Sequence, residues 1–245
     1  MRTRHKGNST PFKIIQVAMG MFLEKGVSQT TVAAIANKLK ISTGNITFYY
    51  PTKEHVLGLL VEMLCAFQWE MMKKESTDGV NPLTAACLET AAMAAICVEN
   101  EFAKDFYLSA YTQAIPLEII RKNDARRAKI IYAETCKEWD DGRFAEMQSI
   151  VSGIEYGLFM VTDSSAPMER RVEDALRAVM SVYQVPTSEQ DETLKKVFSM
   201  DYRGIGRRIL KEFIDYVEKS NANAVAKVVA VKKAQLKAKK TAMRK

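Results

Sequence analysis

A short polar stretch near the N-terminus carries the side chains with the clearest chemistry. It contains Thr43, Asn45, Thr47 and Phe48, which are small polar groups and one aromatic ring. An asparagine amide can bind adenine through two hydrogen bonds, and a threonine methyl or a phenyl ring can contact the methyl group of thymine. These four side chains are therefore candidate contacts to the base edges of DNA.

The pattern around this stretch predicts the helix that must hold it. Ser42 supplies a hydroxyl that can cap a helix, Ile46 is an apolar residue within it, and Pro51 prevents it from continuing. A third short helix is therefore expected over residues 43–49.

Two further helices are expected before it. Apolar residues recur at helical spacing over residues 12–25, and Gly26 follows as a stop signal. Thr30 and Thr31 offer capping hydroxyls for a second helix over residues 32–39.

The second and third of these helices fit a helix-turn-helix. The turn between them, residues 39–42, includes Ile41, which we expect to point inward. In such a unit the second helix of the pair enters the major groove with its N-terminal residues facing the bases. Antiparallel helical hairpins in ordinary cores give a similar pattern, so the prediction depends on the combination of features.

That combination resembles the tetracycline-repressor (TetR) family of one-component regulators, over about residues 12–57. The matching residues are Ile14-Ile15, Ala18, Phe22, Lys25-Gly26, Thr30-Thr31-Val32, Ile35-Ala36, Ile41-Ser42, Gly44-Asn45-Ile46, Tyr49-Tyr50 and Lys53-Glu54. The resemblance implies a homodimer whose paired heads bind a palindromic operator in double-stranded DNA. It also implies a helical body with a pocket for a small-molecule effector, whose binding changes the spacing of the two heads.

The resemblance also assigns roles by position. Thr31, Tyr49 and Lys53 stand at positions that contact DNA phosphates. An anionic phosphate near Lys53 would relieve the unfavourable placement of a cation at the start of a helix. Two residues depart from the family pattern: Thr47 stands where tyrosine is common, and Lys40 where glycine is common. Thr47 cannot make the aromatic contact that a tyrosine would make, and Phe48 is the candidate to replace it. Lys40 implies that the turn tolerates a residue other than glycine.

The formal net charge of +7 is unevenly distributed. Residues 1–55 carry eight Lys or Arg and two acids, and residues 221–245 carry eight Lys or Arg and no acid, whereas the region between them is acidic. Basic ends and an acidic body suggest that the termini meet a polyanion. A solvated face is the alternative for each charge run taken alone.

Beyond Pro51 the pattern predicts an all-α body with no strand. The expected helices cover about residues 53–76, 83–98, 102–114, 117–140, 144–161, 172–183 and 205–217. We divide the chain into a helix-turn-helix domain (1–55), a helical regulatory and dimerisation domain (56–220) and a Lys/Ala-rich tail (221–245).

Two of these helices carry apolar seams and suit a helical hairpin. The first seam comprises Phe144, Met147, Val151, Ile154, Leu158 and Val161, with Gly153 and Gly157 on an adjoining face; the second comprises Val172, Leu176, Val179 and Tyr183. The hairpin is either core within one chain or part of a four-helix dimer interface. The sequence leaves both possibilities open.

Aromatic and sulfur-containing side chains crowd the middle helices, and most of them must be core. An apolar cavity with a few hydroxyl groups would nevertheless suit a drug-like or lipid-like effector. The candidate pocket residues are Phe67, Tyr107, Tyr111 and Tyr132, because aromatic faces bury a ligand and phenolic hydroxyls orient it.

The tail over residues 222–245 is either a basic amphipathic helix or a solvated segment. In both cases its charge would strengthen sequence-independent DNA attachment through counterion release. Binding to an anionic membrane surface is a weaker alternative.

Other functional classes lack support in the sequence. His5 and His55 are the only imidazoles, no glycine-rich phosphate loop occurs, and four scattered cysteines show neither disulfide nor zinc spacing. We therefore expect no enzyme, cofactor or metal, with the thiols acting as small buried hydrophobes. With no secretory segment and no run approaching 18 apolar residues, the chain is expected in the cytoplasm, associated with the nucleoid. The principal hypothesis is a ligand-released repressor, and the alternative is a DNA-organising protein without an effector.

Overall fold

The computed structural model describes residues 10–77, 80–162 and 164–219. Within these ranges the chain forms eleven α-helices and no strand, which confirms the all-α prediction. The basic tail, for which two conformations were expected, lies outside the described residues. The helices are α1 (Thr10–Lys25), α2 (Val32–Leu39), α3 (Thr43–Tyr49), α4 (Lys53–Thr77), α5 (Pro82–Glu99), α6 (Glu101–Thr112), α7 (Ala114–Ile131), α8 (Asp141–Phe159), α9 (Met168–Val182), α10 (Thr187–Ser199) and α11 (Tyr202–Lys219).

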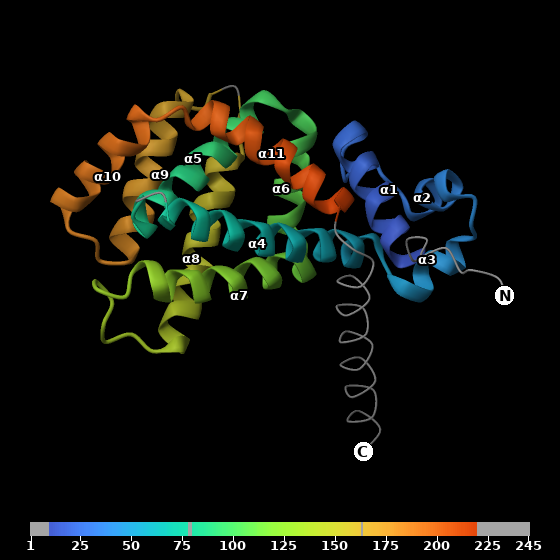
Figure 1. The fold of residues 1–245 in the computed structure, drawn as a ribbon, viewed down its shortest axis with the longest axis horizontal. Helices are drawn as coiled ribbons and strands as arrows, with labels where there is room; N and C mark the ends of the chain where they lie inside the picture. The colour runs from blue at the N-terminus through green and yellow to red at the C-terminus, as the bar shows by residue number, and fades with distance from the viewer. Residues whose placement is uncertain (1–9, 78–79, 163, 220–245) are drawn as a thin grey trace, which may run out of the picture.

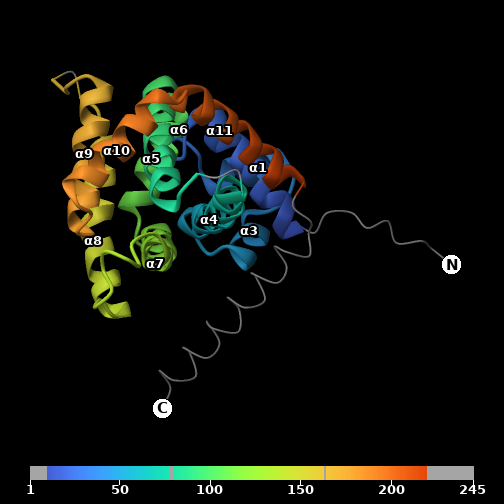
Figure 2. The ribbon, with the colours of Figure 1, turned by 60° about the vertical axis from the view of Figure 1, so that its left-hand side comes forward.

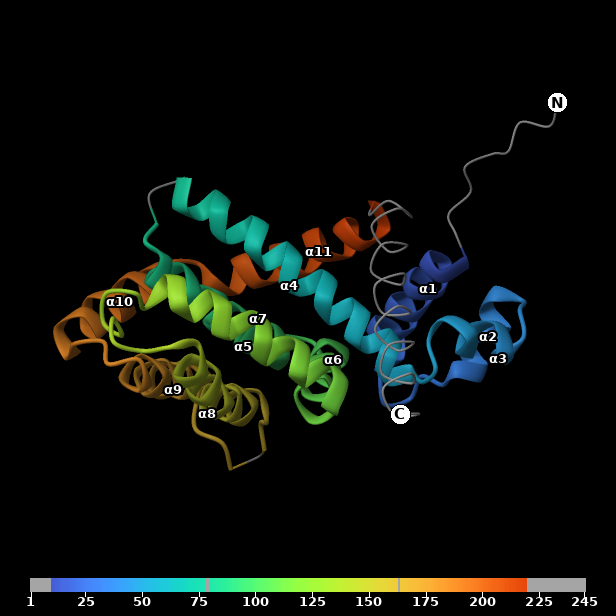
Figure 3. The same cartoon turned by 90° about the horizontal axis from the view of Figure 1, so that it is seen from below.

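The helices α1, α2 and α3 form a small head at one end of the molecule (Figure 1). Phe22 of α1, Ile35 of α2 and Ile46 of α3 are fully buried and form its core. The first three predicted helices therefore occur where the sequence placed them. The long helix α4 leads from this head into the body (Figures 1 and 3).

The head also packs against the body. The helix α1 contacts α4 and α6, and the side-chain amide of Gln16 donates a hydrogen bond to the carbonyl oxygen of Glu218 at 3.1 Å. The last turns of α11 therefore lie against α1, as Figure 2 also shows. The predicted domain boundary near residue 55 stays a prediction, because α4 runs across it without interruption.

The apolar helix α5 lies at the centre of the body and contacts α4, α6, α7, α8, α9, α10 and α11. It is long and apolar enough to cross a membrane, a property that the sequence analysis missed, but 61% of it is buried inside the protein. Its small residues allow close neighbours: a Cβ atom on Gly206 of α11 would lie 2.8 Å from the carbonyl oxygen of Ala92. The helix α5 is therefore the core helix of this fold.

The helices α8 and α9 lie side by side as the predicted hairpin (Figure 3). Most of the α8 seam is buried within the chain, at Phe144, Met147, Val151 and Leu158. The seam is therefore core of a single chain. Pairing with a second copy would involve the opposite, exposed face of this hairpin.

The clearest differences from the prediction in the body are one helix end and one whole helix. The helix α7 ends at Ile131 rather than near residue 140. Beyond it the chain turns so that Thr135 Oγ1 and Cys136 Sγ both donate hydrogen bonds to the carbonyl oxygen of Tyr183, at 2.8 and 3.1 Å. This long-range contact overrides the local helical pattern. The helix α10 was not predicted, because its mostly polar sequence has few apolar residues to mark a buried face.

Candidate nucleic-acid interface and ligand pocket

One face of the short helix α3 packs against the rest of the head, and the opposite face is exposed. Ser42 adopts an extended conformation at its N-cap, and its hydroxyl accepts a hydrogen bond from the backbone N–H of Asn45 at 3.3 Å. Ile46 is fully buried and anchors the helix to the head. As a result Asn45 and its predicted partners are all exposed: Thr43, Asn45, Thr47 and Phe48.

Two of these side chains already have a defined geometry. The hydroxyl of Thr47 donates to the carbonyl oxygen of Gly44 at 3.3 Å, so this bond occupies its proton. Phe48 is 67% exposed, and its ring meets Tyr49 edge-to-face at 5.0 Å between centroids. A large aromatic ring held on the surface at this position is consistent with contact to a partner.

The start of α2 has the geometry of a capped helix. Thr31 is exposed and extended, and its hydroxyl oxygen accepts a hydrogen bond from the backbone N–H of Ala34 at 3.1 Å. At the other end Lys40 closes the helix with a φ of 55°, in the left-handed region that glycine occupies most readily. The expected tolerance of this turn for a non-glycine residue is thus observed.

The other two predicted phosphate contacts are partly engaged within the protein. Tyr49 is half-buried and packs against the core. The Nζ of Lys53 donates to the carbonyl oxygen of Val27 at 2.6 Å. Burial lowers the pKa of this ammonium group, an effect that the carboxylate of Asp105 partly offsets. Lys53 therefore joins α4 to the turn between α1 and α2 in this structure, and its contact with phosphate stays a prediction.

A carboxylate in the body holds the same turn, which the sequence analysis missed. Asp105 of α6 accepts hydrogen bonds from the backbone N–H and the hydroxyl of Ser28, at 2.9 and 2.5 Å. Gly26, with a φ of 86°, lets this carboxylate approach, because a Cβ atom there would lie 2.8 Å from Asp105 Oδ2. The sequence held only a partial signal, namely a glycine stop followed by Ser28.

The electrostatics of the head favour an anionic partner. Between Lys25 and Lys53 the sequence contains no acidic residue, and Lys38 and Lys40 are exposed near the helix-turn-helix. Lys38 has one ion-pair partner, the exposed carboxylate of Glu24 at 3.4 Å. Exposed pairs of this kind are weak, so the segment keeps its positive potential.

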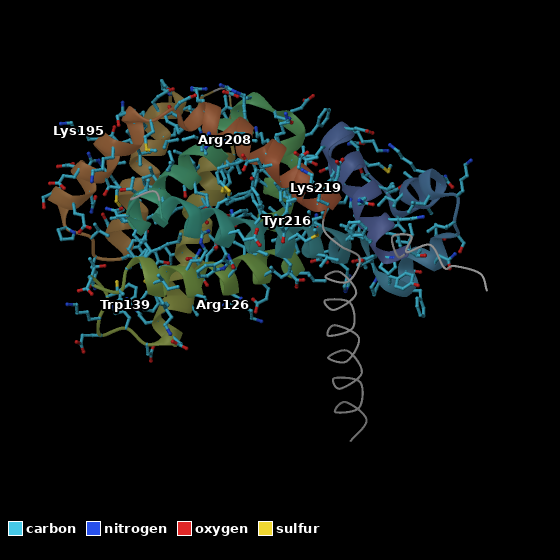
Figure 4. All side chains as sticks on the ribbon, viewed as in Figure 1. Arg126, Trp139, Lys195, Arg208, Tyr216 and Lys219 are labelled. Atoms are coloured by element: carbon cyan, nitrogen blue, oxygen red, sulfur yellow. The ribbon has the colours of Figure 1, made fainter. Side chains whose placement is uncertain are left out.

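A cavity of about 90 Å³ lies in the body among α4, α5, α6, α7, α8 and α9. Three of the four predicted pocket residues line it: Tyr107, Tyr111 and Tyr132. The fourth, Phe67, lines a smaller neighbouring cavity of about 20 Å³ instead. Its ring packs against those of Phe213 and Tyr216 of α11, with centroids 5.8 and 5.6 Å away; Tyr216 is labelled in Figure 4. Phe67 thus contributes mainly to packing.

Charged side chains form the polar wall of this cavity. The two terminal nitrogens of Arg127 donate to the carboxylate of Glu89, at 3.0 and 2.5 Å. Asp124 lies 3.8 Å from the same guanidinium. On α8, the carboxylate of Glu155 accepts a hydrogen bond from the hydroxyl of Tyr111 at 2.9 Å. We refer to Glu89, Asp124, Arg127 and Glu155 as the buried charge cluster.

Burial dominates the protonation of this cluster. It raises the pKa of Glu155 to about 8, and the neighbouring Asp124 carboxylate adds to this effect. Burial also raises the pKa of Asp124 to about 6, although Arg127 opposes the rise. The sequence did not predict this cluster. The one available signal was Glu89, the only charged residue in the otherwise apolar interior of α5.

Comparison with known proteins agrees with this geometry. Residues 14–60 match the family model described as bacterial regulatory proteins, tetR family. This match covers the head and the start of α4, so the N-terminal part of the chain is similar to that family. The proteins that this family model describes are regulatory proteins.

Two further similarities agree with this match. The chain is 33% identical over 72 residues to the uncharacterised HTH-type transcriptional regulator YuxN of Bacillus subtilis (strain 168). This match covers 29% of the chain and only 25% of that protein, about a quarter of its length. The ligand-free crystal structure of RolR matches 75% of this chain and 95% of its own, with a TM-score of 0.56 and 16% identity, which shows a shared fold.

Proposed function

We propose that this chain is a dimeric, tetR-family DNA-binding repressor in the cytoplasm that a small-molecule effector releases from its operator. The observation that carries the proposal is the exposed, uncharged face of α3 within an acid-free segment of the head. Such a helix can enter the major groove, where neutral polar and apolar side chains discriminate base edges. A repressor bound to its operator would lie on the chromosomal DNA, in the nucleoid.

Asn45 is proposed as the principal base-reading residue, with Thr43, Thr47 and Phe48 beside it. The methyl of Thr47 and the ring of Phe48 supply apolar contacts, since the Thr47 hydroxyl proton is engaged by Gly44. Thr31, Tyr49 and Lys53 are proposed phosphate contacts. A phosphate at Lys53 would share its ammonium group with the Val27 carbonyl, so DNA binding and the conformation of this turn would be linked.

A second copy of the chain is the proposed partner for the outer face of α8. Ile150, Gly153, Gly157 and Met160 are all exposed and follow one another at helical spacing. This stripe is apolar and thin, so a symmetry-related helix can approach it closely. Pairing of this kind would place two heads on the two half-sites of a palindrome.

The helix α6 is the proposed connection between pocket and head. Tyr107 and Tyr111 line the cavity, and Asp105, on the same helix, holds the turn at Ser28. A ligand that displaces α6 would therefore act on the Asp105 contact and shift the head. Only a ligand that binds one head spacing better than the other can change DNA affinity in this way.

The test is selection of DNA from a random double-stranded pool by the full chain, followed by a reporter gene carrying the selected site. We expect a few palindromic sites and reduced reporter expression when the protein is present. Dense, weakly selective recovery of unrelated sequences would instead support the DNA-organising alternative, and failure to bind any DNA at low salt would contradict both. Increased reporter expression would contradict repression alone.

A further inference from the structure

The buried charge cluster carries more negative than positive charge. Glu89, Asp124 and Glu155 are three carboxyl groups, and Arg127 is the one cation among the residues that line this cavity. Isolated buried charges are strongly unfavourable unless they are paired. The wall of the cavity is thus short of positive charge.

The single cation is already committed to one carboxylate. Both terminal nitrogens of Arg127 bind Glu89, and Asp124 shares the same guanidinium at a longer distance. Among the described residues Glu155 has no cation within ion-pair distance, and it accepts a hydrogen bond from the neutral Tyr111 hydroxyl. An ionised Glu155 would therefore have no cation of its own to compensate its charge.

One donor in the cavity wall also lacks a partner. The side chain of Arg127 is only 9% exposed, and its Nε forms no hydrogen bond within the described residues. Buried donors of this kind are rare in folded proteins and usually indicate a bound molecule or water. This observation is independent of the acidic charge and marks the same cavity as a place for a ligand.

We propose that the cavity binds a small organic cation, with its positive group beside Glu155 and its apolar body against Tyr107, Tyr111 and Tyr132. The inference rests on the proposed effector pocket and names the chemical class of its ligand. Aromatic faces attract cations and also bury apolar surface. An oxygen on the ligand, or a water beside it, would satisfy the Nε–H of Arg127.

The cavity volume limits the size of this ligand. A cavity of about 90 Å³ is smaller than the cavity of about 150 Å³ that holds benzene, so it suits a short alkylammonium ion rather than an aromatic ring. Anionic molecules are disfavoured because they would add a further negative charge next to Glu89, Asp124 and Glu155. Uncharged molecules of equal shape would gain the apolar contacts alone.

Binding of a cation should be coupled to release of a proton. The groups that face Glu155 are Tyr111 from α6, Asp124 and Arg127 from α7, and Glu89 from α5. Because the pKa of Glu155 is about 8, it is mostly protonated at pH 7, and a bound cation would favour its ionised form. Burial holds the pKa of Tyr111 far above this range, and that of Asp124, at about 6, lies below it.

Three small probes distinguish charge from shape: ethylammonium, the uncharged ethanol and the anionic acetate. Isothermal titration calorimetry with the full chain should show binding of the cation at least about tenfold tighter than of either other probe. Ethylammonium, like a lysine ammonium group, stays charged over the pH range used, so its affinity should rise up to about eightfold between pH 7 and 8.5 through Glu155.

The variant Glu155→Gln should weaken cation binding about tenfold or more and abolish its dependence on pH, while binding of ethanol stays the same. Glu146→Gln, an exposed position on the same helix, is the matched control and should behave as the unmodified protein. Thermal unfolding of both variants checks that they fold. The pH series on the unmodified chain tests the proposal without any substitution.

Equal binding of ethanol, preference for acetate, or no binding of the cation would overturn the proposal. The function in DNA binding is tested separately, by adding ethylammonium to the protein bound to its selected operator. Calorimetry could show selective, Glu155-dependent binding of the cation while the complex with DNA stays unchanged. That result would support the proposed ligand class and contradict the proposed release from DNA by this cation.

Discussion

The face of α3 and the cavity in the body are the two chemically distinct surfaces of this protein, and their construction is opposite. On α3 the polar side chains are exposed and only Ile46 beneath them belongs to the core. In the cavity Arg127 is itself part of the core, with 9% of its side chain exposed, and the three carboxyl groups beside it are half-buried. Substitutions on α3 should therefore change binding alone, whereas substitutions in the cavity should change stability and binding together.

The largest difference is expected for arginine. Arg127→Leu would leave Glu89 and Asp124 buried without their cation, which should lower the free energy of unfolding by about 3–5 kcal/mol. Its neighbour Arg126 is exposed on α7 (Figure 4), so Arg126→Leu should change stability by no more than about 0.5 kcal/mol. Urea denaturation of both variants measures this, and equal stability would show that the cluster is not a buried unit.

The stability of the protein should depend on pH through the cavity, where Glu155 lies, and not through the exposed face of α3. Burial raises the pKa of Glu155 to about 8 in the folded chain, above the ordinary value of 4.5 in the unfolded chain. Between these values the folded state binds more protons, so the stabilising effect is complete below pH 4.5 and is lost as pH rises through 8. The expected slope is up to about 1.4 kcal/mol per pH unit.

Glu155→Gln should remove this part of the pH dependence, and Glu146→Gln should retain it. Denaturation curves of the two variants and the unmodified chain at pH 5, 6, 7 and 8 provide the comparison. Parallel pH profiles for all three proteins would contradict a raised pKa at Glu155.

The contact between the two regions should give an intermediate effect. Asp105→Ala removes two hydrogen bonds to Ser28, which should lower the free energy of unfolding by about 1–2 kcal/mol and weaken operator binding, because the turn before α2 loses its support. The exposed Asp174→Ala serves as control and should leave both quantities unchanged. Undiminished DNA affinity in Asp105→Ala would argue against α6 as the connection.

The smallest effect on stability is expected on α3 itself. Phe48 is 67% exposed, so Phe48→Ala should change the free energy of unfolding by less than about 0.5 kcal/mol. Operator affinity should nevertheless fall about fivefold, the value of one lost apolar contact to a base. Fluorescence anisotropy with the selected operator measures the affinity. A large loss of stability would place Phe48 in the core rather than at the interface.

The sequence predicted the head better than the body because the signals in the head are local. Ser42 and Thr31 cap their helices through neighbouring backbone groups, and the burial of Ile46 follows from helical spacing. Contacts across long sequence distances determine the body instead. The link from Cys136 to Tyr183 ends α7 early, and no local pattern announces it.

The two candidate sites show the same contrast. The exposure of Asn45 and Phe48 could be predicted from a short amphipathic helix, and so could the presence of Tyr107, Tyr111 and Tyr132 around an apolar space. The buried charge cluster could not, because charged residues are normally exposed and only the packing of α5, α7 and α8 brings them together. Phe67 was predicted to line the pocket because its side chain is aromatic. In the structure its ring packs against two aromatic rings of α11 instead.

The most direct measurement of the central claim, that α3 reads bases in the major groove, uses Asn45→Ala. Its affinity should be compared with that of the unmodified chain on the selected operator and on operators with single base-pair changes, with the exposed Asn37→Ala as control. We predict that Asn45→Ala loses discrimination at one base pair of each half-site, worth about 1–3 kcal/mol, while its salt dependence is unchanged. Unaltered discrimination at every position, or an equal loss in Asn37→Ala, would contradict the claim.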